Sequence, residues 1–408
     1  LIKRIKHITG LIYSFSLNVL AYLVSVFYNN SKNLIVFGAS NGNLYCDNSR
    51  ILFEWFFKHN PRVKCAWLTN SLVVEEYLKG KNLPCVNIYS LQGRIALRNA
   101  SVGIISNSLN DLSAKPFYPL KGIKLIQLFH GQSVKAVRFG RKNHKISIKE
   151  SNERRLESKL VNYAISTSDF TTEFWDKCME FGHNKYVVTG YPRNDSLLKV
   201  PKNNINKWHD FIGSNNSSKI IFYAPTWRHG RSETKFFPFN DFKKNKLITY
   251  LDANDFTLLL RPHKHDLSSY KNLRILLNDL TNSERIKLAT HNEFVDANSF
   301  LPFVDILITD YSSIYHDFLL LNKPLIFIPY DYDDYDYHNG FLYDYYNYLP
   351  GPSVYSFDSL IKELDDIKNN DDNYIKKRLE LRNKIHRYRD FSSCERVSNL
   401  VESLILKN

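Results

Sequence analysis

The stretch ILITDYSSIYHDFLLLNKPLIFIPYDYDDYDY, residues 306–337, decides the fold. Its apolar start predicts a buried strand over residues 306–309, and the polar turn at residues 310–313 follows it. A helical pattern then runs over residues 314–321 and ends before Lys323 and Pro324. A second apolar strand is predicted over residues 325–329. Strand, turn, helix and strand in this order form the unit of a parallel α/β sheet.

The turn at residues 310–313 is a candidate binding site. Ligands of parallel sheets bind at the carboxyl ends of the strands, where helix N-termini present free N–H groups and a positive dipole end to anions. Ser312 and Ser313 add two hydroxyl donors for a phosphate. In the alternative interpretation, Asp310 and Ser312 only cap the following helix. The turn by itself favours neither interpretation.

Composition limits the classes of protein and partner. A chain of 408 residues with 43% hydrophobic residues predicts two or three folded domains with sizeable cores. The net charge of +14 favours an anionic partner, which includes lipid headgroups, a phosphate-rich polymer, a nucleotide and nucleic acid. Five scattered cysteines without a CxxC pair indicate a reducing compartment, with neither a disulfide framework nor a zinc site.

Residues 1–30 predict a membrane-associated helix. A basic start precedes a mostly apolar run over residues 8–28, which is about long enough to span a bilayer. A helix lying in the membrane interface fits as well, because polar residues share one narrow stripe at helical spacing. Two alternatives are a cleaved signal peptide and a helix that packs on its own domain. The stripe consists of Lys3, His7, Ser14, Asn18, Ser25 and Asn29.

The remaining chain reads as two α/β domains. Strand-like and helix-like runs alternate over residues 31–198 and again over residues 219–386, which predicts two doubly wound domains. The polar, Asn- and Lys-rich residues 199–218 are predicted to link them. Residues 387–408 are predicted to end in an amphipathic helix that packs back across both domains. Expected strands are 34–37, 63–68, 85–89, 102–106, 124–129, 163–167, 186–189, 220–224, 257–260, 306–309 and 325–328.

Residues 135–159 are strongly basic. A run of charges is usually a solvated face, but this one directly follows the strand-end pair His130 and Gly131. We therefore keep two interpretations open, a solvated surface and a face for a polyanion or a membrane.

Polar clusters end four of the predicted strands, at residues 130–131, 226–228, 261–263 and 310–313. Two facing sheets would bring these clusters to one cleft. Arg228 and Arg261 would then hold phosphate oxygens through paired N–H donors. His130 and His263 would remove a proton from an attacking hydroxyl or stabilise a departing phosphate. A single His or Arg at a strand end is more often structural, but four clusters together favour a site.

The motif set resembles the CDP-glycerol glycerophosphotransferase family, which includes the polymerases and primases of teichoic acids and related capsules. The matching stretches are FHGQSVK at 129–135, GYPRND at 190–195, YAPTWR at 223–228, RPH at 261–263, TDYSSIYHDFLLLNKPLIFIPYD at 309–331 and, in the N-terminal half, DNSRILFEWF at 47–56. The resemblance implies a GT-B fold, with two Rossmann-like domains facing across a cleft. It also implies a peripheral enzyme at the cytoplasmic face of the cell membrane.

The resemblance further implies a reaction. An acceptor hydroxyl would attack the β-phosphorus of a CDP-alditol, most simply CDP-glycerol, and release CMP without a cofactor or a metal. His130 would be the general base, with His263 as the second catalytic residue. The donor would be held in the C-terminal domain. The residues expected to bind it are Arg228, Arg261, Thr309, Asp310, Ser312 and Ser313. Those expected at the acceptor end or in another role in the site are Gly131, Lys135, Arg193, Asn194 and Asp195.

Two departures from the family pattern leave the alditol open. The family commonly reads HGTP where this chain has His130-Gly131-Gln132-Ser133, and Arg-Gly where it has Asn339-Gly340. The expected partners are a CDP-alditol, a lipid-linked polymer acceptor and an anionic membrane surface. A rival interpretation is a GT-B glycosyltransferase that uses a nucleotide-sugar. A basic nucleic-acid-binding protein is disfavoured because the chain contains no recognised binding motif.

Overall fold

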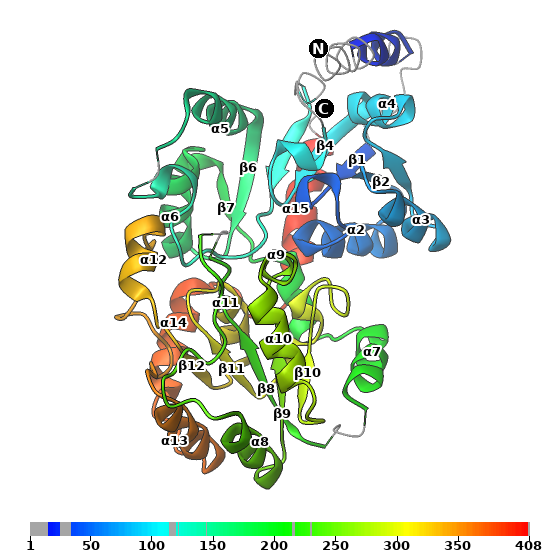
Figure 1. Cartoon of the computed structure of the whole chain (residues 1–408). Coiled ribbons are helices and arrows are strands. Elements are labelled where there is room, and N and C mark those ends of the chain that lie inside the picture. The colour runs from blue at the N-terminus through cyan, green and yellow to red at the C-terminus, as the bar shows by residue number, and fades with distance from the viewer. Residues whose placement is uncertain are drawn as a thin grey trace, which may run out of the picture. The chain divides into compact units, whose positions relative to one another are not determined.

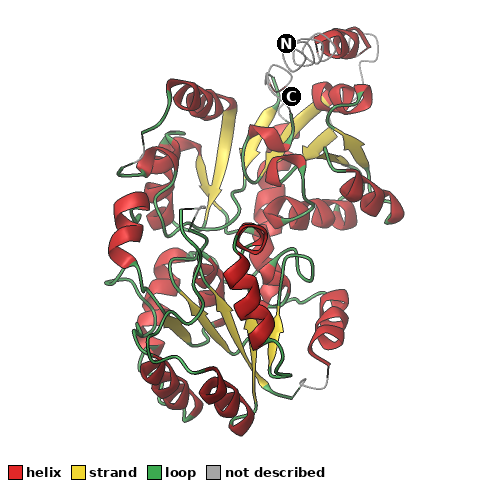
Figure 2. Ribbon diagram, in the orientation of Figure 1, coloured by secondary structure: helices red, strands yellow, loops and turns green. Residues whose placement is uncertain are grey.

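The computed structural model describes residues 15–24, 34–113, 120, 122–143, 145–213, 217–228 and 231–406. Its contacts divide the chain into two compact units. Unit 1 contains Leu1–His130, Ile146–Asp195 and Ser392–Asn408, and unit 2 contains Gly131–Lys145 and Ser196–Phe391. Each unit is an α/β domain with helices flanking its sheet (Figures 1 and 2). No helix in the described ranges is both long and apolar enough to cross a membrane.

Unit 1 contains a parallel sheet in the order β3-β2-β1-β4-β5-β6-β7, within the residues that the structure describes. The strands are β1 (Leu34–Phe37), β2 (Lys64–Thr69), β3 (Cys85–Asn87), β4 (Ala100–Ile105), β5 (Lys124–Gln127), β6 (Val161–Ser166) and β7 (Tyr186–Val188). The helices are α2 (Asp47–His59), α3 (Leu72–Gly80), α4 (Leu91–Asn99), α5 (Ile148–Leu160), α6 (Asp169–Met179) and α15 (Ser393–Ile405). This order is that of a Rossmann sheet, so its switch point lies between β1 and β4.

Unit 2 repeats this topology with fewer strands. Among its described residues, the parallel sheet has the order β10-β9-β8-β11-β12. The strands are β8 (Lys219–Ala224), β9 (Phe256–Leu260), β10 (Ile286–Leu288), β11 (Ile306–Thr309) and β12 (Leu325–Phe327). The helices are α7 (Lys202–Ile212), α8 (Lys244–Ala253), α9 (Lys264–Ser269), α10 (Lys271–Leu280), α11 (Ile314–Phe318), α12 (Tyr332–Asn339), α13 (Phe357–Lys368) and α14 (Ile375–Ile385). The switch point of unit 2 lies between β8 and β11.

Strand composition explains the burial of both sheets. Central strands of a parallel sheet are covered on both faces, so they are apolar throughout rather than alternating. β9 (FTLLL) and β11 (ILIT) are buried along their whole length. Leu258, Leu260 and Ile308 pack with aromatic residues of the loop after β8, including Phe236 and Phe237, in the core of unit 2.

The structure divides the chain differently from the sequence at three places. Residues 131–145, which were expected in the N-terminal domain, belong to unit 2. The predicted linker contains α7, because Trp208 and Ile212 lie one helical turn apart and are both buried. Trp208 stacks on Phe303 with a ring separation of 5.0 Å. The C-terminal helix α15 belongs to unit 1, where it packs against α2 and β4.

Candidate active site

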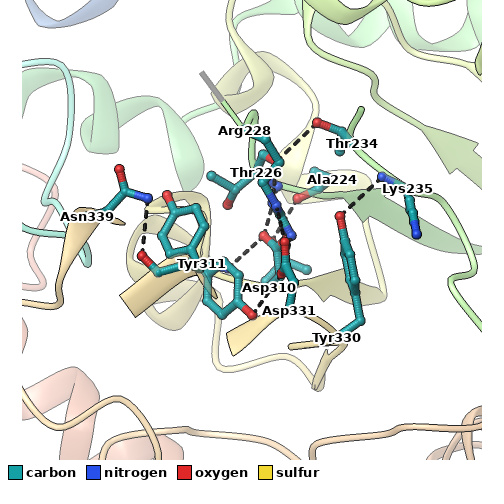
Figure 3. A network of polar contacts seen from close by, with 12 residues as sticks. Ala224, Thr226, Arg228, Thr234, Lys235, Asp310, Tyr311, Tyr330, Asp331 and Asn339 are labelled. Carbon is teal, nitrogen blue, oxygen red and sulfur yellow. Dashed lines mark hydrogen bonds and ion pairs between the residues drawn. The ribbon is translucent and has the colours of Figure 1, made fainter. Parts of the chain in front are cut away.

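The switch point of unit 2 is built on a buried ion-pair network (Figure 3). Arg228, after β8, donates from Nε and Nη2 to the two carboxylate oxygens of Asp331, both at 2.8 Å. Its Nη1 donates to Asp310 Oδ2 at 2.8 Å and to the carbonyl oxygen of Thr226. The other oxygen of Asp310 accepts the backbone N–H groups of Thr226, at 2.8 Å, and of Tyr311, at 2.6 Å. The network therefore fastens the ends of β8, β11 and β12 together.

This network gives Arg228 and Asp310 partners that the sequence did not predict, and these partners suit a positioning role. Arg228 is only 1% exposed, and its contacts use four of the five N–H groups of a guanidinium. Three tyrosine rings also lie within 5.3 Å of the guanidinium carbon. A buried Arg with two carboxylate partners positions the turn and has little capacity left for phosphate. Asp331 is a member of this network that the sequence did not predict, because it lies in a dense run of acidic residues.

The turn after β11 keeps polar groups available. Thr309 is buried, and its hydroxyl donates to the carbonyl oxygen of Ala224 at 2.7 Å, so it joins β11 to β8 rather than binding a ligand. Ser312 and Ser313 are half-buried. Ser312 Oγ accepts a long 3.5 Å contact from the N–H of Ile314, while Ser313 makes no side-chain cap to α11. The hydroxyl groups of these two serines are therefore the side-chain donors that this turn can present to a ligand.

Lys135 is the cation beside this turn. Its segment pairs with residues 340–342: the N–H of Ala136 donates to the carbonyl oxygen of Gly340 at 2.9 Å, and that of Leu342 donates to Val134 at 3.0 Å. Burial, together with the charges of Arg141, Arg228 and Arg231, lowers the pKa of Lys135 to about 8, while Asp310 acts in the opposite direction. Lys135 was expected at the acceptor end, but the structure places it in unit 2, near Asp310.

Arg261 also differs from its expected role. Its Nη1 lies 2.7 Å from the carbonyl oxygen of Ala289, and its Nη2 lies 2.9 Å from that of Phe294. Further carbonyl contacts at 3.3 Å come from Thr290 and Val295. Burial lowers the pKa of Arg261 to about 10, so the side chain stays charged near neutral pH. Because backbone carbonyls occupy its donors, Arg261 organises the loop after β10 rather than reaching into solvent.

His263 lies at the end of β9 as a neutral hydrogen-bond donor. Its ring stacks on Trp227 with 4.7 Å between the centroids and 9° between the planes. Nδ1 accepts the N–H of His265 at 3.3 Å, so the ring proton is on Nε2. Burial first, and then the neighbouring cations, including Lys135, lower its pKa to about 3. A ring that stays neutral has an N–H donor at Nε2 and carries no charge.

His130 lies in unit 1, at the turn after β5, and its side chain is exposed. The turn has unusual backbone geometry, with φ of +54° at Phe129 and +128° at Gly131. The buried side chain of Asn48, from α2, donates to the carbonyl oxygens of Leu128 at 3.1 Å and Phe129 at 2.8 Å. A glycine at 131 meets the required φ, and the amide of Asn48 holds the turn in place.

Arg193, Asn194 and Asp195 support this turn and the helix beside it. Arg193 donates its backbone N–H to Asn48 Oδ1 at 2.9 Å and a guanidinium N–H to the carbonyl oxygen of His130. Asn194 is buried. The carboxylate of Asp195 accepts the N–H groups of Ser393, at 2.9 Å, and Cys394, at 2.7 Å, at the start of α15. These residues were expected at the acceptor end, and in the structure they hold unit 1 together around His130.

The structure thus brings the predicted residues together within each unit. Lys135, Arg228, His263 and Asp310 lie close together in unit 2. Unit 1 holds His130 with Arg193 and its partners. Convergence of both sets on one cleft stays a prediction. No group of three or more His, Cys, Asp and Glu side chains in the described ranges is arranged to hold a metal ion. Asn48 and Trp227 were missed individually, although both fall within the motif stretches quoted from the sequence.

Comparison with known proteins identifies the family. Residues 20–403 match the family model of CDP-glycerol:poly(glycerophosphate) glycerophosphotransferase. A teichoic acid glycerol-phosphate transferase of Staphylococcus aureus (strain NCTC 8325 / PS 47) is 28% identical over 380 residues, which cover 91% of this chain and 93% of that protein. A teichoic acid poly(glycerol phosphate) polymerase of Bacillus subtilis (strain 168) is 26% identical over 358 residues, covering 83% of this chain but 44% of the polymerase.

The fold comparison agrees with this match. A crystal structure of the wall teichoic acid polymerase TagF, in a variant soaked with CDPG, superposes with a TM-score of 0.78 at 22% sequence identity and covers 99% of this chain and 97% of that one. The α/β fold with parallel sheets that was expected from the sequence is confirmed, and so is the family that the motifs resemble. The chain belongs to the CDP-glycerol:poly(glycerophosphate) glycerophosphotransferase family.

Proposed function

We propose that this enzyme transfers an alditol phosphate, glycerol phosphate in the first instance, from a CDP-alditol to a hydroxyl of a membrane-linked teichoic acid acceptor. The family match supports glycerol phosphate as the transferred group. The observation that carries the proposal is the position of Lys135. Its pKa responds to Asp310 and to the guanidinium groups of Arg141, Arg228 and Arg231, so this half-buried lysine belongs to a group of cations at the switch point of unit 2 that suits a diphosphate.

The proposed reaction is a phosphoryl transfer without a covalent enzyme intermediate. The acceptor oxygen forms a bond to the β-phosphorus of the donor as the bond between that phosphorus and the oxygen of CMP breaks. The hydroxyl proton passes to His130, which acts as general base. Lys135 and the Nε2–H of His263 stabilise charge on the phosphate oxygens, and Ser312 and Ser313 add hydroxyl donors.

The other predicted residues act by positioning in this proposal. Arg228, Thr309 and Asp310 fix the turn that presents the serines, and Arg261 fixes the loop after β10. Gly131, Arg193, Asn194 and Asp195 fix the turn that presents His130. The proposed location is peripheral, at the cytoplasmic face of the cell membrane, where the acceptor is lipid-linked. The helix over residues 15–24 supports it, because its exposed side chains include Phe15, Val19 and Leu23.

An assay of nucleotide release tests the function. The protein is incubated with CDP-glycerol, CDP-ribitol or nucleotide-sugars and a lipid-linked acceptor. We expect CMP from a CDP-alditol, and His130→Ala is expected to lower turnover about 100-fold or more, the loss typical of a general base. His183→Ala, another exposed histidine of unit 1, is the matched control and should stay active. Release of a nucleoside diphosphate from a nucleotide-sugar would identify a glycosyltransferase instead. Normal turnover by a folded His130→Ala protein would contradict the assignment of His130 as the general base.

A further inference from the structure

His316, in α11, is a fully buried histidine that takes no part in the proposed chemistry. Its Nδ1 lies 3.0 Å from the carbonyl oxygen of Gln132, and its Nε2 lies 2.6 Å from the hydroxyl of Tyr343. The Tyr343 hydroxyl also lies 2.7 Å from that of Tyr315, one residue before His316. The imidazole thus connects α11 to two segments that are far away in sequence, one at residue 132 and one at residue 343.

The carbonyl group of Gln132 determines the directions of these hydrogen bonds. The carbonyl of Gln132 can only accept, so Nδ1 of His316 carries the proton and donates. Nε2 of the neutral ring must then accept from the Tyr343 hydroxyl, and Tyr343 accepts from Tyr315. Burial lowers the pKa of His316 to about 3, which keeps the ring in this neutral form. His386 fixes the backbone as well, with its Nε2 2.7 Å from the carbonyl oxygen of His316.

The contacts close a ring around the segment that carries Lys135. His316 holds Gln132 on one side. On the other side, the segment pairs with residues 340–342 through the backbone bonds of Val134 and Ala136, and residue 343 returns to His316. Lys135 lies between these anchors and forms an antiparallel bridge with Phe341. The position of Lys135 beside Asp310 therefore depends on these contacts, which join its segment to unit 2. The preceding residue of the HG pair, His130, belongs to unit 1.

We propose that His316 is a positioning residue for the donor site: with Tyr343 it clamps residues 132–136 to unit 2 and so holds Lys135 beside the turn at residues 310–313. The assignment of Lys135 to the donor phosphates rests on the proposed function, whereas the clamp itself does not. A histidine that only filled space in the core would stabilise unit 2, but its replacement would not change the donor affinity by way of Lys135.

The experiment uses the full chain and a graded set of variants. His316→Phe keeps a ring but removes both nitrogens. His316→Asn keeps an N–H donor near the Nδ1 position and is the conservative variant for the Gln132 contact. Tyr343→Phe removes one hydroxyl and keeps the fold testable if the histidine variants fail to fold. Tyr250→Phe is the matched control, because it loses a 2.8 Å hydrogen bond to Asp365 elsewhere in unit 2.

Two measurements are made on each variant. The first is hydrogen exchange at the amides of Ala136 and Leu342, which report pairing of the clamped segment. The second is calorimetric affinity for CDP, combined with Lys135→Ala in a double-mutant cycle. We expect faster exchange and an affinity loss of about tenfold or more in His316→Phe, the scale of one charge-assisted hydrogen bond. The loss of affinity should be smaller in His316→Asn and absent in Tyr250→Phe. In a protein that already carries Lys135→Ala, adding His316→Phe should lower the affinity little further.

The outcomes separate the clamp from the proposed function. Unchanged exchange in folded His316→Phe and Tyr343→Phe proteins would overturn the clamp. Faster exchange with additive losses in the cycle would overturn the link to Lys135. If the wild-type protein did not bind CDP, the donor assignment would fail, and the exchange measurement would still decide whether His316 holds residues 132–136.

Discussion

The three cations associated with the donor site differ in what neutralises them. Arg228 has two carboxylate partners, and Arg261 has backbone carbonyls. Burial, and repulsion from the guanidinium groups of Arg141, Arg228 and Arg231, lower the pKa of Lys135 to about 8, while Asp310 acts in the opposite direction. An anionic ligand would relieve this repulsion. Lys135 is therefore the cation that we expect to bind phosphate.

This contrast predicts a pH dependence of donor binding. The lysine is protonated below its pKa of about 8 and neutral above it, so CDP affinity should fall as the pH rises from 7 to 9. The terminal phosphate of CDP, with a second pKa of about 6, is mostly ionised at pH 7 and gains charge above it, so its titration does not account for a loss of affinity. Of the neighbours, the guanidinium groups stay charged and His263 stays neutral. Lys135→Arg should flatten the profile, and calorimetry at several pH values checks it. A profile in Lys135→Arg as steep as that of the wild type would contradict the assignment.

At the residue scale, the sequence predicted which side chains come together in unit 2, but not the partners that they bind. Polar residues at strand ends identified Arg228, His263 and Asp310, because parallel topology brings those ends to one edge. The sequence could not show that the guanidinium of Arg228 donates hydrogen bonds to Asp331, which lies 103 positions away. Nor could it show that loop carbonyls occupy Arg261. Both roles depend on partners that no local pattern specifies.

At the element scale, α15 completes unit 1 from the far end of the chain. It follows the whole of unit 2 in sequence, yet it packs against α2 and β4. The carboxylate of Asp195 accepts two of the N–H groups at its start, which a helix terminus otherwise leaves without intrahelical partners. One side chain thus couples the GYPRND stretch to the last helix.

Removing this cap should weaken unit 1 selectively. Asp195→Ala is expected to lower the free energy of unfolding by about 0.5–2 kcal/mol, the range for losing an N-cap. Hydrogen exchange should accelerate in α15 and β4 and stay unchanged in unit 2. Ser356→Ala is a matched control, because Ser356 caps α13 in unit 2 at 3.1 Å from the N–H of Ser359. Equal exchange of α15 in wild type and Asp195→Ala would show that the helix does not depend on this cap.

The elements themselves were largely predictable, and the exceptions have physical causes. β1 matches its predicted range, because a compact apolar run between polar residues has few alternatives. β10 was missed: three residues with Lys287 in the middle do not differ from a loop. The assignment of residues 131–145 to unit 2 was missed for another reason. It depends on pairing with residues 340–342, about 200 positions away, which periodicity does not encode.

At the scale of the whole molecule, the helix over residues 15–24 is the segment that we propose contacts a membrane. The rest of the predicted N-terminal helix lies outside the described residues. Asn18, from the predicted polar stripe, accepts a hydrogen bond from Arg94 of α4 at 2.5 Å, and Arg98 lies 4.9 Å from the ring of Tyr22. Phe15, Val19 and Leu23 follow at intervals of four residues and are exposed. Asn18 and Tyr22 thus contact α4, while Phe15, Val19 and Leu23 form an exposed apolar stripe at helical spacing.

An uncovered apolar stripe on a basic protein suits the surface of an anionic bilayer. The triple variant Phe15→Ser, Val19→Ser and Leu23→Ser should keep the contact between Asn18 and Arg94. It should lower the affinity for vesicles that contain anionic lipid by tenfold or more, since each apolar side chain contributes about 1.5–3 kcal/mol when buried. Leu72→Ser with Val73→Ser, on the exposed face of α3, is the matched control. Vesicle sedimentation measures both, and high salt should weaken the remaining binding through the basic surface. Unchanged sedimentation of the triple variant would exclude this stripe as the anchor and leave the basic segment, residues 135–159, as the membrane contact to test next.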